Sequence, residues 1–309
     1  MSAPEGGEGD TAGAAPSATG SSQVLRAAAW MSGALASFTL IAVAGREASR
    51  SVSTGTLMFY RCWFALAVLL VVVVISGKGL SQFRTMQIGT HGLRSVIHFG
   101  AQYSWLYALP LIPLAELFAI EFTAPLWTAL LAPLLLGERL TIWRVAAVVL
   151  GFAGTLVVVR PGSAEINVGT MSALFAAIGF SIHYVITKKL MQRDPALTVI
   201  FYMALFQAVL AAILLTANLQ LPDATAAAWI FVVAACGLVA HFSIARAFAL
   251  ADAIIVTPMD FLRLPLIALV GVVLYAEPLN PWTLAGGAMV ILANFINIWS
   301  ERRHPANRL

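Results

Sequence analysis

About ten long apolar segments make up most of this sequence, and they limit the folds open to it more than any other feature. Each segment is close to the roughly 20 residues that a helix needs to cross the hydrocarbon core of a bilayer. Short polar connections separate them. The expected spans are 26–45, 54–76, 92–110, 114–136, 143–160, 168–188, 197–217, 226–247, 253–275 and 281–299. We therefore expect most of the chain to lie in a lipid bilayer.

Composition agrees with this prediction and favours helices over strands. The chain is 60% hydrophobic and 10% charged, with a mean hydropathy of +0.88, whereas a soluble domain has about 25% charged residues. A membrane β-barrel would alternate apolar and polar residues over about ten positions. The run from Ala65 to Ile75 is apolar throughout. The expected fold class is an all-α integral membrane protein.

One of these segments occurs twice. Residues 114–139, LAELFAIEFTAPLWTALLAPLLLGER, are echoed by residues 254–277, IIVTPMDFLRLPLIALVGVVLYAE. Asp260 stands as far before Glu277 as Glu121 stands before Glu138. At the same offset Trp143 corresponds to Trp282. A repeat of this kind predicts two related halves.

A second match relates the beginnings of the two halves. GREASRSVSTGTLMFYR (45–61) aligns with TKKLMQRDPALTVIFYM (187–203), so that Phe59 and Tyr60 correspond to Phe201 and Tyr202. Five expected helices precede the loop at 161–167 and five follow it. An odd number of spans per half forces the second half to insert upside down. The sequence thus predicts two inverted five-helix repeats, at 26–161 and 167–300.

Positive residues predict which side of the membrane the termini occupy, because short cytoplasmic loops hold the excess of Lys and Arg. With a cytoplasmic N-terminus, three basic residues fall outside: Arg46, Arg50 and Arg160. Thirteen fall inside: Arg26, Lys78, Arg84, Arg94, Arg139, Arg144, Lys188, Lys189, Arg193, Arg246, Arg302, Arg303 and Arg308. We expect both termini in the cytoplasm, with tails at 1–25, disordered, and 301–309. The net charge of +4 then requires no nucleic-acid partner.

Several motifs resemble the ten-helix drug/metabolite transporter superfamily, EamA type. They are the LGER run Leu136–Arg139, its counterpart LYAEP at 274–278, and GFAGTLVVVRPG at 151–162. Pro278 stands where the first copy has Arg139, so a shared role for that arginine is not expected. The resemblance covers about 26–300. It implies a membrane transporter and not an enzyme, with a small-molecule substrate and no cofactor.

Three stretches are most similar to the bacterial subgroup that includes riboflavin and S-adenosylmethionine importers. They are HFGAQYSW (98–105), IPLAELFAIEFTAPLW (112–127) and PMDFLRLPLIA (258–268). The resemblance implies uptake by alternating access in a bacterial inner membrane, with riboflavin as the first candidate. S-adenosylmethionine import and export of amino acids or other metabolites are the alternatives. Proton coupling and a homodimer are left open, and an intramembrane enzyme or a scaffold is a remote alternative.

Charged residues inside the expected spans are the first candidates for the site, because a charge at the bilayer centre is costly and usually serves a pathway or a partner. Glu121 lies in the fourth span. It is expected to contact substrate, to carry a proton, or to be a protonated carboxyl bonded to a neighbouring helix. Asp260 and Arg263 are three residues apart on the ninth span, a spacing that allows them to pair. Either they hide each other's charge, or substrate competes for the guanidinium. Pro125, Pro133, Pro258 and Pro265 predict broken helices beside these charges.

Other polar side chains are weaker candidates for lining the same cavity. His98 and Gln102 lie four apart on the third span, followed by Tyr103, Trp105 and Tyr107, on which a flat substrate could stack. Trp105 and Tyr107 also fit a position at the membrane interface. His183, Tyr184 and His241 complete the set, and each histidine also fits a hydrogen bond between helices. Arg61 is expected to snorkel to the interface.

The remaining polar residues are assigned structural roles. Glu116 is placed near the entrance, and Glu138 and Glu277 are expected to act as latches at opposite helix ends. Cys62 and Cys236 are expected to be small packing residues. The sequence contains no HExxH, no CxxC and no phosphate-binding glycine loop, so neither metal nor nucleotide is expected.

Overall fold

The computed structural model describes residues 18–77, 79–136, 142–160, 167–214, 216–251, 256 and 259–303. The regular structure of these residues is helical. The first half contains α1 (Ala18–Ala48), α2 (Thr54–Ser76), the short 3-10 helix η1 (Leu80–Phe83), α3 (Ile88–Ala108), α4 (Leu114–Glu121), α5 (Ala124–Leu136) and α6 (Ile142–Val159). The second contains α7 (Val168–Leu190), α8 (Ala196–Leu214), η2 (Thr216–Asn218), α9 (Ala224–Leu250), α11 (Arg263–Tyr275) and α12 (Pro281–Arg303).

The lengths of these helices confirm the all-α membrane fold. Eight stretches of the described residues are long and apolar enough to cross a bilayer, and α4 with α5 forms one of them. Two more elements complete the expected ten. They are α11, which is apolar but shorter, and α3, which carries buried polar side chains such as His91, Arg94 and His98. α1 begins at Ala18, before the expected start at residue 26.

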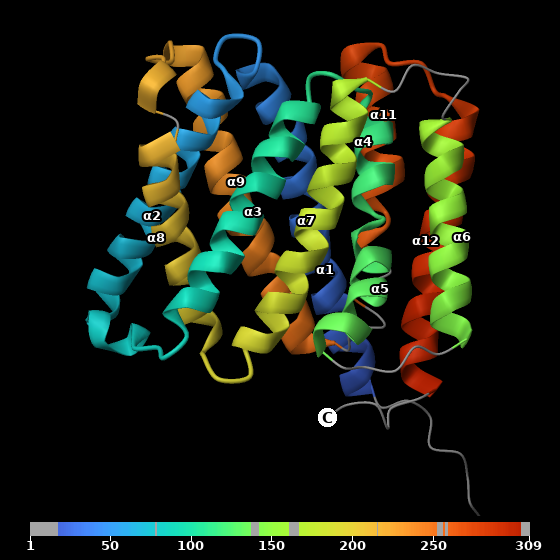
Figure 1. Cartoon of the computed structure of the whole chain (residues 1–309), viewed down its shortest axis with the longest axis horizontal. Helices are drawn as coiled ribbons and strands as arrows, with labels where there is room; N and C mark the ends of the chain where they lie inside the picture. The colour runs from blue at the N-terminus through green and yellow to red at the C-terminus, as the bar shows by residue number, and fades with distance from the viewer. Residues whose placement is uncertain are drawn as a thin grey trace, which may run out of the picture.

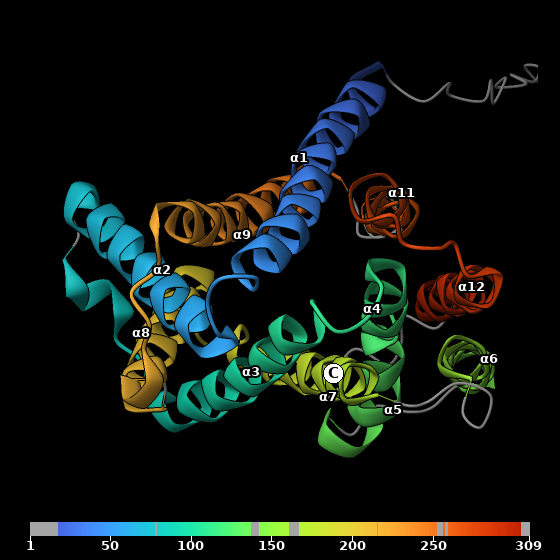
Figure 2. The same cartoon turned by 90° about the horizontal axis from the view of Figure 1, so that it is seen from above.

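Helix pairing follows the repeat. α1 packs along α9, and α7 packs along α3; exchanging the two halves turns one of these pairs into the other. α6 pairs with α12, and α2 with α8, so each of these pairs joins a helix to its own counterpart. Figure 2 shows α6 beside α12 at one edge and α2 beside α8 at the other. The fold is therefore built around a pseudo-twofold relation between the repeats.

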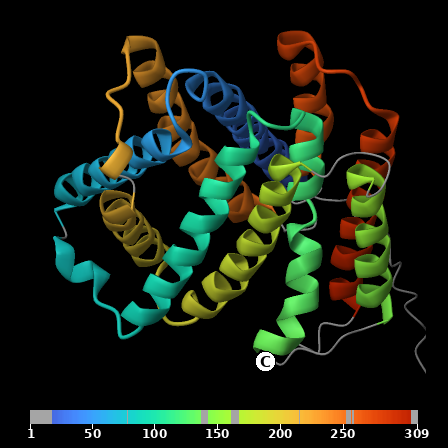
Figure 3. The ribbon, with the colours of Figure 1, turned by 45° about the horizontal axis from the view of Figure 1, so that its top comes forward.

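The two repeats run in opposite directions through the bundle. In Figure 1, α1 rises from the bottom to the top, whereas its counterpart α7 descends from the top to the bottom. The α2–α3 and α7–α8 connections consequently lie at the bottom, and the α1–α2 connection lies at the top (Figures 1 and 3). The beginning of α1 and the end of α12 share the bottom end.

Two of the expected spans are broken at equivalent positions. The offset that relates Glu121 to Asp260 also relates the start of α5 to the start of α11, and the end of α5 to the end of α11. Two non-helical turn residues precede each start, Phe122–Thr123 in one repeat and Phe261–Leu262 in the other. The predicted breaks are thus confirmed near Pro125 and Pro265. Pro133 lies inside α5, and Pro258 lies outside the described residues.

The break between α4 and α5 frees backbone groups that lipid cannot satisfy, and other parts of the protein satisfy them. Proline lacks the N–H that would continue the helical ladder. The buried side chain of Asn294 on α12 donates a hydrogen bond of 2.8 Å to the carbonyl of Phe122. The hydroxyl of Thr123 donates to the carbonyl of Ile120 at 2.6 Å. The break therefore places Glu121 at a helix end inside the bundle, supported by α12.

Candidate functional site

The three charged residues singled out within the fourth and ninth spans meet in the structure. The guanidinium of Arg263 lies 3.3 Å from a carboxylate oxygen of Glu121 and 3.0 Å from one of Asp260. The side chains of Arg263, Glu121 and Asp260 are 7%, 17% and 27% exposed, respectively. We call these residues the charged triad. It joins the broken helix of one repeat to that of the other.

Aromatic rings surround the charged triad. The guanidinium carbon of Arg263 lies 4.5 Å from the ring centre of Phe38, 5.3 Å from that of Phe118 and 4.9 Å from that of Phe122. Rings at this distance attract a cation through their negative faces. The indole N–H of Trp105 donates a 2.8 Å hydrogen bond to the second carboxylate oxygen of Glu121. Trp105 thus contacts the charged triad directly.

The charged triad has more negative than positive groups. When all three side chains are ionised, two carboxylates face one guanidinium, which leaves one uncompensated negative charge. Within a bilayer such a charge is costly. In addition, Oδ1 of Asp260 and Nε of Arg263 are buried without hydrogen-bond partners. The charged triad therefore has an excess of negative charge and unused hydrogen-bonding atoms.

His98 and Gln102 of α3 each contact a neighbouring helix. Nδ1 of His98 lies 2.6 Å from the side-chain nitrogen of Gln207 on α8, so the amide donates and the imidazole accepts. The ring of His98 is 4.2 Å from that of His183 on α7. The side-chain oxygen of Gln102 accepts a hydrogen bond from the guanidinium of Arg61 on α2. These contacts place both residues inside the bundle.

His183, Tyr184 and His241 connect this polar region to the charged triad. Tyr184, next to His183, is 53% exposed and interacts electrostatically with Glu121, Asp260 and Arg263. His241 on α9 is exposed, yet it interacts with Arg61 and Arg94. Its ring also lies 6.3 Å from that of Phe38. Tyr184 and His241 therefore combine solvent-accessible surface with electrostatic neighbours inside the bundle.

Comparison with known proteins identifies the fold and the family. The profile of the EamA-like transporter family matches residues 25–160 and 167–299. The chain belongs to the EamA-like transporter family. A solved crystal structure shares the fold, with a TM-score of 0.61 at 20% sequence identity, covering 92% of this chain and 98% of that one. The EamA family and its relatives are transporters, so this chain is a transporter and not an enzyme.

The curated relatives of this EamA-like transporter are named for different substrates. An S-adenosylmethionine uptake transporter of Rickettsia prowazekii is 28% identical over 250 residues, which cover 81% of this chain and 84% of the relative. A riboflavin transporter of Vibrio cholerae is 26% identical over 291 residues, covering 92% and 97%. A pseudopaline exporter of Pseudomonas aeruginosa is 28% identical over 271 residues, covering 84% and 92%.

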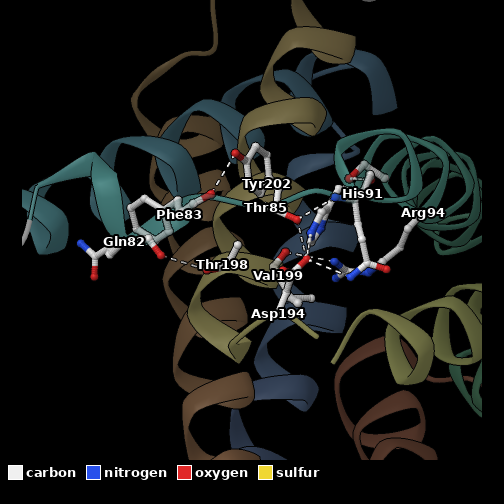
Figure 4. A network of polar contacts seen from close by, with 11 residues as sticks. Gln82, Phe83, Thr85, His91, Arg94, Asp194, Thr198, Val199 and Tyr202 are labelled. Atoms are coloured by element: carbon white, nitrogen blue, oxygen red, sulfur yellow. Dashed lines mark hydrogen bonds and ion pairs between the residues drawn. The ribbon is translucent and has the colours of Figure 1, made fainter. Parts of the chain in front are cut away.

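Two arginines of this EamA-like transporter occupy positions that differ from those expected from the sequence. Arg61 was expected to snorkel to the interface, but it turns to α3 and bonds to Gln102. Arg94 was expected near the cytoplasmic surface as a topology signal, but it is 3% exposed and donates to the carbonyl of Val199 at 3.0 Å (Figure 4). The polar positions of α3, His91, Arg94, His98 and Gln102, are spaced three or four residues apart. That stripe was the available signal, because such spacing puts them on one helix face.

The other polar candidates have structural partners. Glu116 accepts a 2.9 Å hydrogen bond from the hydroxyl of Thr170 on α7. Glu277 pairs with Arg46, whereas Glu138 lies outside the described residues. Cys62 and Cys236 are both free thiols. In the part of the chain that the structure describes, no group of three or more His, Cys, Asp or Glu side chains is placed to hold a metal ion.

Proposed function

We propose that the protein is a secondary active carrier that moves a small organic metabolite by alternating access. The observation that supports this proposal best is the charged triad, in which Glu121 at one broken helix meets Asp260 and Arg263 at the equivalent break of the other repeat. In carriers built from inverted repeats, substrate binds between the repeats near the membrane midplane, at helices of this kind. A rocking motion of one repeat against the other would change the contacts between these three side chains.

The charged triad also supports coupling to protons. Arg263 can neutralise one carboxylate, so the other is stabilised by a proton or by a cationic group of the substrate. We expect Glu121→Gln and Asp260→Asn to abolish the pH dependence of transport, because each removes a carboxylate that can exchange a proton. Glu116→Gln is the matched control, since Glu116 is also on α4 but bonds to Thr170. Unchanged pH profiles in both triad variants would remove the carboxylates from the proton path.

The substrate is the finer part of the proposal. Riboflavin remains the first candidate, because three stretches resemble importers of that type and a riboflavin transporter is among the relatives. S-adenosylmethionine is the second, and two observations favour it. A sulfonium cation suits the excess negative charge of the triad and its aromatic rings, and a relative named for this substrate is also similar over most of the chain.

Uptake by purified protein in liposomes tests both the mechanism and the substrate. Vesicles supplied with an inward proton gradient should accumulate labelled riboflavin or S-adenosylmethionine without any nucleotide, and a requirement for ATP would contradict the carrier mechanism. In cells, rescue of a riboflavin auxotroph that lacks its own uptake system would identify the vitamin as substrate. If neither solute is taken up but a preloaded metabolite leaves the vesicles, the protein is an exporter, as the name of one relative describes.

We further propose that the carrier lies in the bacterial inner membrane with both termini in the cytoplasm. The excess of Lys and Arg in the connections on that side supports this orientation. The repeats would then be 26–161 and 167–300, and the cytoplasmic segments 1–25 and 301–309 would include the first residues of α1 and the last residues of α12. Cysteines placed near either terminus should react with an impermeant maleimide only after the cells are opened. Formation of a homodimer remains a separate prediction, to be checked by cross-linking in the membrane.

A further inference from the structure

A group of positively charged and titratable side chains lies on α2, α3, α7 and α9, beside the charged triad. Its members, which we call the cationic cluster, are Arg61, Arg94, His98, His183 and His241. His98 interacts electrostatically with the other four, and the rings of His98 and His183 are 4.2 Å apart. The side chains thus form one group although they come from four helices.

The two guanidiniums of the cationic cluster have only neutral partners in the part of the chain that the structure describes. Arg61 contacts the side-chain oxygen of Gln102 and lies 4.0 Å from the sulfur of Cys62. Arg94 donates to the carbonyl of Val199 at 3.0 Å and lies 3.2 Å from the sulfur of Met203. Desolvating a charge costs several kcal/mol, about as much as a well-placed counterion returns.

Other arginines of the protein have the carboxylate partner that Arg61 and Arg94 lack among the described residues. Arg263 has Glu121 and Asp260, Arg46 has Glu277, and even the exposed Arg50 has Glu47 at 2.9 Å. Within the cationic cluster, Nε of Arg61, Nε of Arg94 and Nδ1 of His183 are buried and have no hydrogen-bond partner. The cluster therefore offers both charge and unused hydrogen-bonding atoms to an anionic group.

Three links connect the cationic cluster to the charged triad. Phe38 lies against both, 6.3 Å from the ring of His241 and 4.5 Å from the guanidinium carbon of Arg263. On α3, Gln102 bonds to Arg61 and Trp105, one turn later, bonds to Glu121. On α7, His183 belongs to the cluster while its neighbour Tyr184 interacts with the triad. The interior thus has a positive pole and a negative pole about one to two helical turns apart.

We propose that the cationic cluster is an anion-binding subsite that takes the carboxylate of the transported metabolite, while Glu121 and Asp260 face a cationic part of the same molecule. Arg61 and Arg94 provide the charge, since guanidinium N–H groups match the geometry of a carboxylate. The ligand class is a small zwitterion, such as a compound that carries an amino-acid group. This inference rests on the proposed transport function and selects among its substrates in favour of one with a carboxylate.

Competition between two otherwise matched ligands tests the subsite. S-adenosylmethionine and decarboxylated S-adenosylmethionine differ only in the carboxylate. Wild-type protein in detergent, followed by its thermal shift, should bind the first more tightly by roughly tenfold or more, as expected for hydrogen bonds to charged groups. Arg61→Gln and Arg94→Gln should lose this preference, and Arg61→Lys should keep part of it. Arg50→Gln is the control, because Arg50 is an exposed arginine at a helix end.

The proposal would be overturned if wild type and Arg61→Gln showed the same preference for S-adenosylmethionine over its decarboxylated form. Arg61→Gln alone decides the question if Arg94→Gln does not fold, because Arg94 is the more deeply buried of the two. A second arm uses acetate against chloride at equal concentration, and it needs no metabolite. If acetate stabilises the wild-type protein more than chloride does, and this difference disappears in Arg61→Gln, the subsite is supported. Failure to transport either solute would then count only against the proposed function. Transport without any carboxylate preference would reject the subsite and retain the carrier.

Discussion

At the end of the bundle where α1 stops, Arg46 pairs with Glu277 of the α11–α12 connection, whereas the opposite end is joined by hydrogen bonds to Asp194. Nε of Arg46 donates to the carbonyl of Leu109 at 2.9 Å, and its Nη2 donates to the carbonyls of Leu109 and Ile112. Glu277 accepts from the backbone N–H of Leu114 at 2.9 Å. This charged latch, Arg46 and Glu277, connects α1, the α3–α4 connection and the second repeat.

The opposite end uses a carboxylate without an arginine (Figure 4). Asp194, in the α7–α8 connection, accepts hydrogen bonds from the hydroxyl of Thr85 at 2.7 Å and from the side chain of Gln87 at 3.4 Å. The imidazole of His91 lies 2.8 Å from the same oxygen and is fully buried. We call these four residues the loop network. It connects the N-terminal end of α3 to the second repeat.

The repeat shows that these two ends are not equivalent. The offset from Tyr60 to Tyr202 relates Asp194 to Val52 and His91 to Val233, and both valines are buried. Two polar side chains of the loop network thus correspond to buried valines in the other repeat. Because the backbone plan is shared, the difference in side chains can make the two ends open under different conditions. We expect the charged latch to depend on its ion pair and the loop network to depend on the ionised carboxylate of Asp194.

The largest effect is expected when the charged latch is broken. Glu277→Gln leaves Arg46 beside backbone carbonyls without its counterion, which costs about 3 kcal/mol for a mostly buried pair. The melting temperature in detergent should fall by several degrees. A cysteine introduced at Tyr184, in a background without Cys62 and Cys236, should react faster with an impermeant maleimide from the side of the latch. Unchanged reactivity would show that the latch does not close this end.

A change that keeps both charges provides an independent way to weaken the latch. A Cβ added at Gly271 would overlap the carboxylate of Glu277, so Gly271→Ala must displace that side chain. We expect the cysteine at position 184 to react faster with the maleimide, as in Glu277→Gln, but with a smaller loss of stability. Gly237→Ala is the control, because a Cβ at that position meets no atom within 4 Å. Equal behaviour of the two alanine variants would contradict the role of Glu277.

A smaller effect is expected from Asp194→Asn. Burial acts to raise the pKa of Asp194. Hydrogen bonds from Thr85 and His91 nevertheless hold this pKa below its usual value. Its stabilisation is therefore present above the unfolded pKa of about 3.9 and is lost as the pH falls through the folded pKa. Asp194→Asn should lower the free energy of unfolding by about 2 kcal/mol at pH 7. The difference between the melting temperatures of the two proteins should shrink below about pH 4; a constant difference would contradict this assignment.

The residues that the sequence predicted correctly are those whose physics is local. Hydrophobic length predicted the spans, prolines predicted the breaks near Pro125 and Pro265, and the three-residue spacing predicted that Asp260 and Arg263 can pair. These predictions needed no knowledge of side-chain directions. The contact between Glu121 and Arg263 joins the two repeats, and the sequence did not predict it.

The sequence failed where a residue's role depends on its partner. Arg61 lies close enough to a helix end to reach the interface, and only the position of Gln102 shows that it turns inward. Arg94 lies near a predicted span boundary, which made it look like a topology signal. For Asp194 the sequence led to no prediction, because nothing in its loop indicates that His91 of another helix lies beside it. Contacts between helices far apart in sequence determine all three cases.

The smallest expected effect compares one residue type at equivalent positions of the two repeats. The hydroxyl of Tyr202 donates a 3.0 Å hydrogen bond to the carbonyl of Phe83, beside the loop network. Tyr202→Phe should therefore lower the free energy of unfolding by about 1 kcal/mol. For its counterpart Tyr60 no hydrogen bond of the hydroxyl is found among the described residues, so Tyr60→Phe should leave the melting temperature unchanged. If both variants lost the same free energy of unfolding, the hydroxyl of Tyr60 would also contribute to stability. The polar contacts at the two ends would then differ less than their side chains indicate.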